Sequence, residues 1–314
     1  MRALARSLGI GAVVACSLAV ALAGSAGQTR SRAARNGAMA TGAGPADIVP
    51  QASLLVTDLT GRMFVMSRSG QVLRRIPGSL GPAVQALELS PDRRHAYAST
   101  YLRNGGLRLY DLDLATGHKR ALVRAAFGPA LNPAQTQLAY VTISFASGIP
   151  FARALVVRDL RTQQVHSIPL AQRVVVGTPP ELIINWSPDG RRIAIFDGHR
   201  IRLVDVATAP NVHSQPAVPE PPDRSGQPPF YAPVYLDAHH VVVDTNCCIH
   251  DQHLAAINVL SGARRAFATL SSPPQNLLRL RSGELLVEDA LSELAIVTRG
   301  HVHVIANHIA AAAA

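Results

Sequence analysis

The chain has 314 residues, enough for one large domain or two modest ones. Hydrophobic residues make up 48% of it and charged residues 16%, a balance that excludes intrinsic disorder over most of the chain. The formal charge of +10 does not indicate nucleic-acid binding, because the arginines are scattered and aromatic residues, which stack on bases, amount to 4%. We therefore expect no nucleic-acid partner.

The N-terminus predicts export from the cytoplasm. A short basic segment precedes an apolar run over residues 8–23, and small residues at 21–26 suit cleavage by a signal peptidase. Two alternatives stay open: the run is close to the minimum length of a membrane span and could remain as an anchor, or Cys16 could carry a lipid. We predict a signal peptide or membrane anchor over residues 1–26. The rest of the chain is then secreted, or extracytoplasmic and tethered to the membrane through this segment alone.

The segments that follow differ sharply in composition. Residues 27–50 are rich in Ala, Gly, Ser and Arg without periodicity, which predicts a flexible linker. From Ser53 onward, short runs of Val, Ile, Leu and Tyr alternate with Gly, Pro, Asp, Asn and Ser, the pattern of strands and turns. The proline-rich stretch 208–233 predicts a long loop. The alanine-rich tail, residues 310–314, is expected to be disordered.

Two sequence elements recur along the chain. The first is an apolar residue, a polar turn and an alternating strand; its copies begin at residues 89, 131 and 186, with weaker ones at 235 and 280. The second is a strand, an Asp or Asn, a short turn and another strand, and its turns fall at positions 70, 117, 163, 209, 262 and 300. Six copies with a mean spacing of about 46 residues match the period of a four-stranded propeller blade.

One copy carries a family resemblance. W-S-P-D-G-R-R-I-A-I at 186–195, followed by I-R-L-V-D-V-A-T at 201–208, resembles the repeat of TolB-type, WD-repeat-like β-propellers. The resemblance covers roughly residues 53–307 and implies an all-β, six-bladed propeller with four-stranded antiparallel blades, which we place at residues 51–309. It also implies protein contacts at the cell envelope. The first blade shows three strands, at 53–58, 62–67 and 71–76, so one terminus must supply the fourth, and the sequence leaves open which one.

The same motif holds the lone tryptophan and could be read as a site. Three aligned copies in one chain instead indicate scaffold, in which Pro sets the first corner of a turn, Asp caps it and Gly accepts a positive φ. We therefore assign structural roles to residues of this copy and of the copy that begins at residue 89: Trp186, Ser187, Pro188, Asp189, Gly190, Ser90, Pro91 and Asp92.

The stretch D-T-N-C-C-I-H-D-Q-H at 244–253 has three interpretations. The thiolates and imidazoles of Cys247, Cys248, His250 and His253 could bind zinc or copper, although adjacent ligands reach one ion poorly. A disulfide between the two cysteines is favoured outside the cytoplasm. It would be strained, because adjacent Cα atoms lie about 3.8 Å apart and disulfides prefer about 4.4–6.8 Å. Free or intermolecular thiols are the third possibility. The sequence assigns no metal here.

No G-x-S-x-G, H-E-x-x-H or P-loop motif occurs, so we predict no catalytic residue and no cofactor. The predicted function is an extracytoplasmic, non-enzymatic scaffold that binds a protein, peptide or envelope polymer as a monomer. We expect partner contact first at the long loops 142–153 and 210–232. One alternative is a hydrolase or lyase with its site in the central funnel. The other is a metal- or redox-responsive module that uses Cys247 and Cys248.

Overall fold

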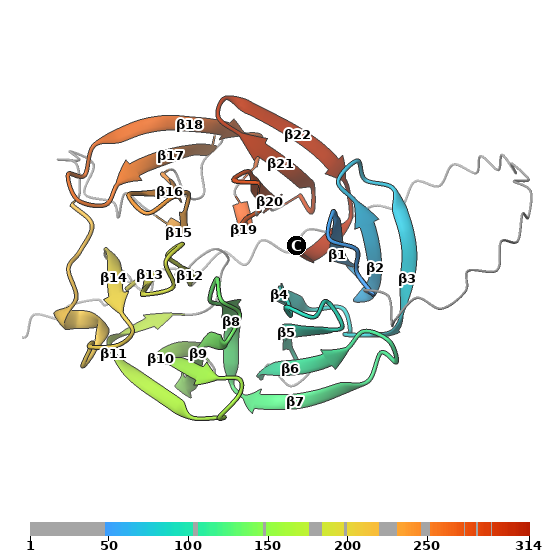
Figure 1. The fold of residues 1–314 in the computed structure, drawn as a ribbon, viewed down its shortest axis with the longest axis horizontal. Coiled ribbons are helices and arrows are strands. Elements are labelled where there is room, and N and C mark those ends of the chain that lie inside the picture. The colour runs from blue at the N-terminus through green and yellow to red at the C-terminus, as the bar shows by residue number, and fades with distance from the viewer. Residues whose placement is uncertain are drawn as a thin grey trace, which may run out of the picture. The chain divides into compact units, whose positions relative to one another are not determined.

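The computed structural model describes residues 48–102, 106–146, 149–175, 184–197, 200–219, 231–245, 252–272, 274–280, 282–289 and 291–314. The chain divides into two units, residues 1–44 and 45–314, and all described residues belong to the second. Its strands form six antiparallel sheets around a central axis, so the predicted six-bladed β-propeller is confirmed (Figure 1). The one helix among the described residues is the 3₁₀ helix η1 (Val212–Ser214). None of the described helices is long and apolar enough to cross a membrane.

The blades follow one another in chain order. From the axis outward, the first contains β23 (Ile309–Ala313), β1 (Ser53–Asp58), β2 (Arg62–Ser67) and β3 (Val72–Ser79). The second contains β4 (Val84–Leu89), β5 (His95–Tyr101), β6 (Leu107–Asp113) and β7 (Lys119–Arg124). The third contains β8 (Ala126–Leu131), β9 (Gln137–Ala146), β10 (Ile149–Asp159) and β11 (Val165–Val175). The fourth contains β12 (Asn185–Trp186), β13 (Arg192–Phe196) and β14 (Ile201–Asp205). The fifth contains β15 (Tyr231–Tyr235), β16 (His240–Asp244), β17 (Gln252–Asn258) and β18 (Arg264–Leu270). The sixth contains β19 (Pro274–Arg279), β20 (Leu285–Asp289), β21 (Leu294–Thr298) and β22 (His301–Ala306).

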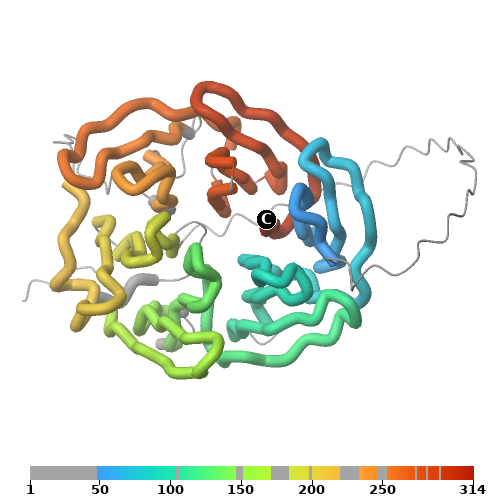
Figure 2. Tube along the Cα trace, in the orientation of Figure 1, coloured from blue at the N-terminus to red at the C-terminus, as the bar shows by residue number. Residues whose placement is uncertain are grey.

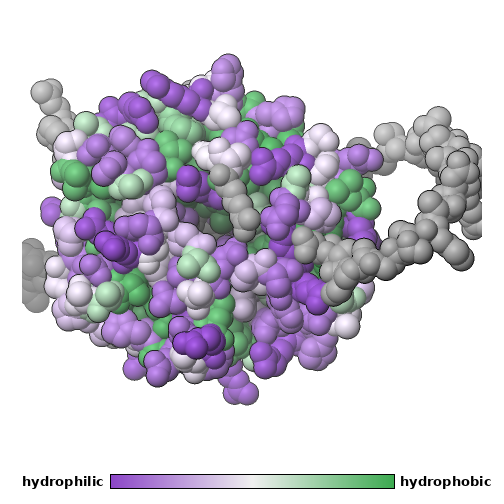
Figure 3. Space-filling model, viewed as in Figure 1, coloured by the Kyte–Doolittle hydropathy of each residue, from purple (hydrophilic) through white to green (hydrophobic). Residues whose placement is uncertain are grey.

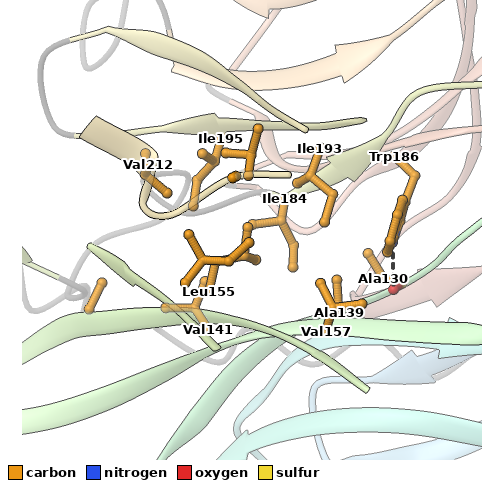
Figure 4. Close-up of a cluster of buried hydrophobic side chains, with 14 of the residues drawn as sticks. Ala130, Ala139, Val141, Leu155, Val157, Ile184, Trp186, Ile193, Ile195 and Val212 are labelled. Carbon is orange, nitrogen blue, oxygen red and sulfur yellow. Dashed lines mark hydrogen bonds between the residues drawn. The ribbon is translucent and has the colours of Figure 1, made fainter. Parts of the chain in front are cut away.

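The hydrophobic core lies between neighbouring blades. Alternate side chains of each inner strand point to opposite faces of its sheet, so every blade is apolar on both faces. Figure 4 shows one such layer, in which Ile193 and Ile195 of β13 face Leu155 and Val157 of β10. Each blade is therefore held by the two blades beside it, in addition to its own ladder.

The C-terminal strand closes the ring. β23 pairs antiparallel with β1, and Figure 2 shows the red C-terminal strand beside the blue first blade. Ala311 and Ala313 pack against the second blade's core, and Ala312 packs against the sixth's. The prediction that residues 310–314 are disordered is therefore wrong. Methyl side chains suit the innermost position, where two blades converge, and pairing there removes an exposed sheet edge.

The predicted linker also ends earlier than expected. Val49 is fully buried in the core between the first two blades. The buried guanidinium of Arg93 donates to the carbonyl oxygens of Val49, Pro50 and Ser53, at 2.6, 2.9 and 2.8 Å. Residues 48–50 are thus docked on the propeller, because a buried arginine needs acceptors and the entering chain supplies them. Residues 1–47, with the predicted signal segment, lie outside the described residues.

The fourth blade departs from the four-stranded pattern, which the other five blades confirm. The outer edge of β14 is covered by a short irregular segment. The Leu203 N–H donates to the Pro216 carbonyl at 3.1 Å, and the Val218 N–H donates to the Ile201 carbonyl at 2.9 Å. The prolines in this segment lack an N–H, which prevents a regular fourth strand. The described part of the predicted loop, 210–219, therefore belongs to the blade.

The other predicted loop, 142–153, is mostly strand. β9 and β10 have 10 and 11 residues and pair with each other as far as Ala146 and Ile149. The run T-I-S-F-A at 142–146 contains the β-formers Thr142, Ile143 and Phe145 and has no Gly or Pro, so the hairpin extends instead of opening into a loop. Phe145 in this extension is 43% exposed.

The turns that define the repeat join adjacent blades. Gly70, Gly117 and Gly262 have positive φ and lie against the outermost segment of the preceding blade. A Cβ atom on Gly117 would lie 2.2 Å from the Pro77 carbonyl oxygen of β3. The N–H of Gly300 donates to the Phe267 carbonyl of β18 at 2.7 Å. The regular spacing of these turns is therefore the spacing of blade-to-blade contacts.

Candidate functional site in the central channel

A cavity of about 300 Å³ lies among the innermost strands of the ring. The strands β4, β8, β12 and β19 line it, together with the turns that follow them and with Ala314. On the face of the ring seen in Figure 3, hydrophilic residues predominate and apolar residues form small separate groups. The channel is the place where side chains from several blades converge.

Bulges in two inner strands bring glutamines to the cavity. The ladder of β4 shifts register between Val84 and Ala86, and that of β19 shifts between Pro274 and Asn276. Gln85 and Gln275 are the extra residues, and both line the cavity. A bulge redirects a side chain out of the regular alternation of a strand. Both glutamines are followed, eight positions later, by a residue with positive φ in the next turn, Arg93 and Gly283 respectively.

Three carboxamides on the inner strands around the cavity have hydrogen-bonding groups without a partner among the described residues. The side chain of Asn276 is 8% exposed, and it makes no hydrogen bond to another described residue. Gln85 and Gln275 are half-buried, and their side chains likewise have no partner within the described ranges. A buried carboxamide without partners costs free energy, which applies to Asn276, whereas Gln85 and Gln275 are partly open to water. Together the three amides offer hydrogen-bonding groups that a ligand or water can complete.

In a fourth carboxamide, that of Asn185, the oxygen has a hydrogen-bond partner and the nitrogen has none among the described residues. The Oδ1 of Asn185 on β12 accepts a hydrogen bond from the Tyr235 N–H of β15 at 2.9 Å. This bond fixes the side chain in the channel wall. With Asn132 and Gln135, which lie in the turn after β8 and also border the cavity, amide side chains reach it from the second, third, fourth and sixth blades.

Glu88 lies in the same wall. Burial raises the pKa of its carboxyl to about 8, although a hydrogen bond from the Leu131 N–H opposes this shift. The side chain borders the cavity and is half-buried. The raised pKa favours the protonated, uncharged form of Glu88 at neutral pH.

The rest of the wall has apolar residues, one cation and, in the turn after β8, the carboxamides of Asn132 and Gln135. Phe127, Pro129 and Ile184 border the cavity, and the exposed guanidinium of Arg279 lies where β19 ends. Trp186 also borders it. The indole is 5% exposed and donates its Nε1–H to the Ala130 carbonyl of β8 at 3.1 Å (Figure 4).

The motif residues assigned structural roles form matching turns. Ser187 Oγ accepts the Arg192 N–H at 2.9 Å, and Ser90 Oγ accepts the His95 N–H at 3.0 Å. Each serine also donates to the Asp two positions later, Asp189 or Asp92. Gly190 adopts the positive φ expected of it. Trp186 and Pro188, in addition, border the cavity.

The cysteine-rich stretch is only partly visible. Cys247, Cys248 and His250 lie outside the described residues, so the predicted metal, disulfide and thiol states remain predictions. His253 is exposed on β17, and its Nδ1 lies 3.2 Å from the Oγ1 of Thr269. In the part of the chain that the structure describes, no three His, Cys, Asp or Glu residues are grouped to hold a metal ion.

The residues that line the channel were not predicted as a site. Their sequence separation is large, and no motif joins them. The available signal was the recurrence of Gln at the same distance before the turn in the second and sixth blades, at 85 and 275. The repeat alignment began after these positions and did not include them.

Comparisons with known proteins support the fold. No family model matches the sequence, and no curated protein is found to be similar to it. Among solved structures, TolB from Acinetobacter baumannii superposes with a TM-score of 0.59 at 12% identity, over 83% of this chain and 65% of that chain. A chain of a nidogen/laminin complex superposes with a TM-score of 0.57 at 9% identity, over 83% of this chain and 97% of that chain. This chain thus spans about two thirds of the length of TolB. Both likenesses show a shared propeller fold.

Proposed function

We propose that this protein is a non-enzymatic binding module that works outside the cytoplasm and receives its ligand in the central channel. The observation that carries this proposal is the set of carboxamides of Gln85, Gln275 and Asn276 around one cavity, which make no side-chain hydrogen bond to any described residue. Neutral amides donate and accept hydrogen bonds but make poor nucleophiles and proton carriers. Such a wall is suited to recognition.

The hydrolase or lyase alternative has less support. Catalysis in the funnel needs a general acid and a general base within reach of one substrate. Among the lining residues, Glu88 and Arg279 have ionisable side chains, and Glu88 is engaged by the Leu131 N–H. A single carboxyl held in the wall between two blades is better suited to joining them than to proton transfer.

The fold itself favours a scaffold. Side chains on inner strands form hydrogen bonds to the backbone of the next blade, and the repeat turns pack on the preceding blade. These contacts hold the ring rigid, which preorganises a binding site. TolB and the nidogen/laminin complex share the architecture, and the second of these is an assembly of proteins. This support is an analogy at the level of the fold. It agrees with a protein, peptide or envelope polymer as partner.

The location can be tested by fractionation. If residues 1–26 direct export, the protein will be found outside the cytoplasmic fraction, and its first residue will lie after the apolar run or the run will anchor it to the membrane. Mass spectrometry of the N-terminus distinguishes these two forms. Recovery from the cytoplasm with Met1 intact would contradict the proposed location.

The binding site can be tested by photocrosslinking in the native host. A photoreactive amino acid replaces Gln85 or Gln275, and a matched control carries it at Val165, which is 56% exposed on the outer strand β11. We expect a discrete adduct from the two channel positions and none from the rim. Adducts from position 165 alone, with none from 85 or 275, would place binding on the rim and overturn the proposal.

A further inference from the structure

We propose that the channel takes a neutral polyhydroxylated small molecule, a monosaccharide or disaccharide, held by carboxamides from several blades. This inference rests on the proposed function, because it names the ligand of the same channel. It is argued from which hydrogen-bonding groups remain free, from the charge of the wall, and from the size of the cavity.

Three backbone groups on the inner edges of β8 and β15 already have partners. On β8, the Leu131 N–H is bonded to Glu88 and the Ala130 carbonyl to the indole of Trp186. On β15, the Tyr235 N–H is bonded to Asn185. An extended peptide that binds as an added strand needs free N–H and C=O groups along such an edge. These hydrogen bonds therefore disfavour an added peptide strand along β8 and β15, whereas the side-chain amides remain available.

Carboxamides and hydroxyls are complementary. Each carboxamide offers an oxygen with two acceptor sites and a nitrogen with two donors, and each hydroxyl can both donate and accept. Gln85, Gln275 and Asn276 supply such groups from two blades, and Asn185 adds its Nδ2 from a third. A ligand with hydroxyls around a ring can satisfy amides that approach it from several directions. A ligand with a single polar end cannot.

The wall is close to neutral where the amides gather. Glu88 retains its proton at neutral pH because burial raises its pKa. Arg279 is exposed, so water screens its charge. Neither an anion nor a cation would find a buried counter-charge among the described lining residues, and a buried charge without one is costly. A neutral ligand avoids this cost.

The size and the apolar part of the wall agree with a small ring. A volume of about 300 Å³ is at the lower end of the range for small-molecule sites. Phe127, Pro129 and Ile184 give the cavity an apolar side, on which the C–H groups of a sugar ring can make dispersion contacts. A longer saccharide would have to extend beyond the cavity.

The test uses the full-length protein and its single tryptophan. Trp186 borders the cavity, so its fluorescence reports a ligand bound there. Glucose, galactose, N-acetylglucosamine, trehalose and myo-inositol are titrated, and isothermal calorimetry confirms any response. We expect at least one of them to bind saturably with a Kd of about 1 mM or tighter.

Variants connect the response to the amides. Gln275→Leu and Gln85→Leu keep the side-chain size and remove the hydrogen-bonding groups, and each should weaken binding about tenfold or more. Gln71→Leu, at an exposed turn position on the rim, is the matched control and should leave the Kd unchanged. Far-UV circular dichroism checks that each variant is folded. The use of two independent channel variants keeps the test valid if one of them fails to fold.

The outcomes separate this inference from the proposed function. Saccharide binding that both channel variants weaken supports the inference. Binding that neither weakens lies elsewhere and overturns it. If no saccharide binds at millimolar concentrations but crosslinks still form at positions 85 and 275, the ligand class is wrong while the channel remains the binding site. If no saccharide binds and no such crosslink forms, both proposals fail.

Discussion

Glu88 and Asn185 occupy equivalent positions on the inner strands of the second and fourth blades, and each accepts a hydrogen bond from the backbone of the following blade. Glu88 accepts the Leu131 N–H, and Asn185 accepts the Tyr235 N–H at 2.9 Å. Each is followed, five positions later, by the positive-φ residue of its turn, Arg93 or Gly190. The same structural role is thus filled by a carboxyl in one blade and by an amide in another.

Because Glu88 is ionisable and Asn185 is not, the free energy of unfolding should depend on pH through Glu88. Unfolded Glu88 releases its proton near 4.5, whereas the folded protein retains it to about 8. The folded state therefore binds more protons between these values, so stability is greatest below pH 4.5 and falls as pH rises through 8. Gln in place of Glu keeps an acceptor oxygen without the ionisation. Glu88→Gln should be more stable than the wild type at pH 9, by roughly 1–3 kcal/mol after allowing for water in the channel.

Urea unfolding followed by Trp186 fluorescence at pH 5 and pH 9 measures this difference. Other groups contribute equally to both proteins, so the difference between their pH profiles isolates Glu88. Parallel profiles would show that the carboxyl is not buried as described.

Glu288 on β20 predicts a stabilising substitution. Its side chain is buried, and its Oε2 has no partner among the described residues. Burial and the neighbouring Asp289 raise the pKa of Glu288 well above its usual value. Leu286, two positions earlier on β20 and therefore on the same face of the strand, lies in the apolar layer between the sixth and first blades. Glu288→Leu should therefore leave stability unchanged at pH 5 and raise it by about 1–3 kcal/mol at pH 8.

The control for this substitution is Glu284→Leu. Glu284 pairs with Arg68 at 3.2 Å near the surface, and such pairs contribute about 1 kcal/mol or less. Chemical denaturation at pH 5 and pH 8 measures the change in the free energy of unfolding for both variants. A loss of stability in Glu288→Leu at pH 8 would show that the carboxyl has a partner which the described residues do not supply.

Replacement of glycine by alanine should cost different amounts of stability at two of the repeat turns. Gly117 and Gly300 both have positive φ, so replacement by Ala costs about 1 kcal/mol at either position. At Gly117 the new Cβ would also lie 2.2 Å from the Pro77 carbonyl oxygen, whereas at Gly300 nothing lies within 4 Å. We expect Gly117→Ala to lose about 3 kcal/mol or more and Gly300→Ala about 1. Thermal denaturation followed by circular dichroism compares them, and equal losses would refute the contact between blades.

In the closing strand β23, substitution of one buried alanine by a charged residue should destabilise the protein. Ala311 is fully buried between β23 and the second blade, whereas Ala314 is exposed. Ala311→Asp places a charge without a partner in this seam and should cost more than about 3 kcal/mol. Ala314→Asp should be close to neutral. Protease resistance and unfolding midpoints measure both; a stable Ala311→Asp protein would mean that the ring does not depend on β23.

Much of the fold could be predicted from the sequence. The period of about 46 residues identified the blades, and three strands of the first blade were expected at 53–58, 62–67 and 71–76, close to where β1, β2 and β3 lie. The closing strand was missed because a run of alanines has neither alternation nor high β-propensity. Its conformation is imposed by the two blades that enclose it, and local sequence does not contain that information.

The candidate site could not be predicted in the same way. Gln85, Asn185 and Gln275 are far apart in the chain and meet only because the ring brings inner strands to one axis. The two glutamines reach the cavity through bulges, which shift register by one residue and have no strong sequence signal of their own. By contrast, the motif around Trp186 was conspicuous because turn chemistry is local.

The pairing of β23 with β1 has a consequence for synthesis. Thr57 and Ala311, which are joined by a hydrogen bond of 3.4 Å, are separated by 254 residues. The ribosome therefore completes five blades while the first still lacks its innermost strand. Contacts so distant in sequence form slowly, and during that interval the unpaired edge of β1 is a template for association with other chains. A nascent chain that stalls before residue 309 would remain an open ring, so truncated products should aggregate or be degraded instead of accumulating as soluble fragments.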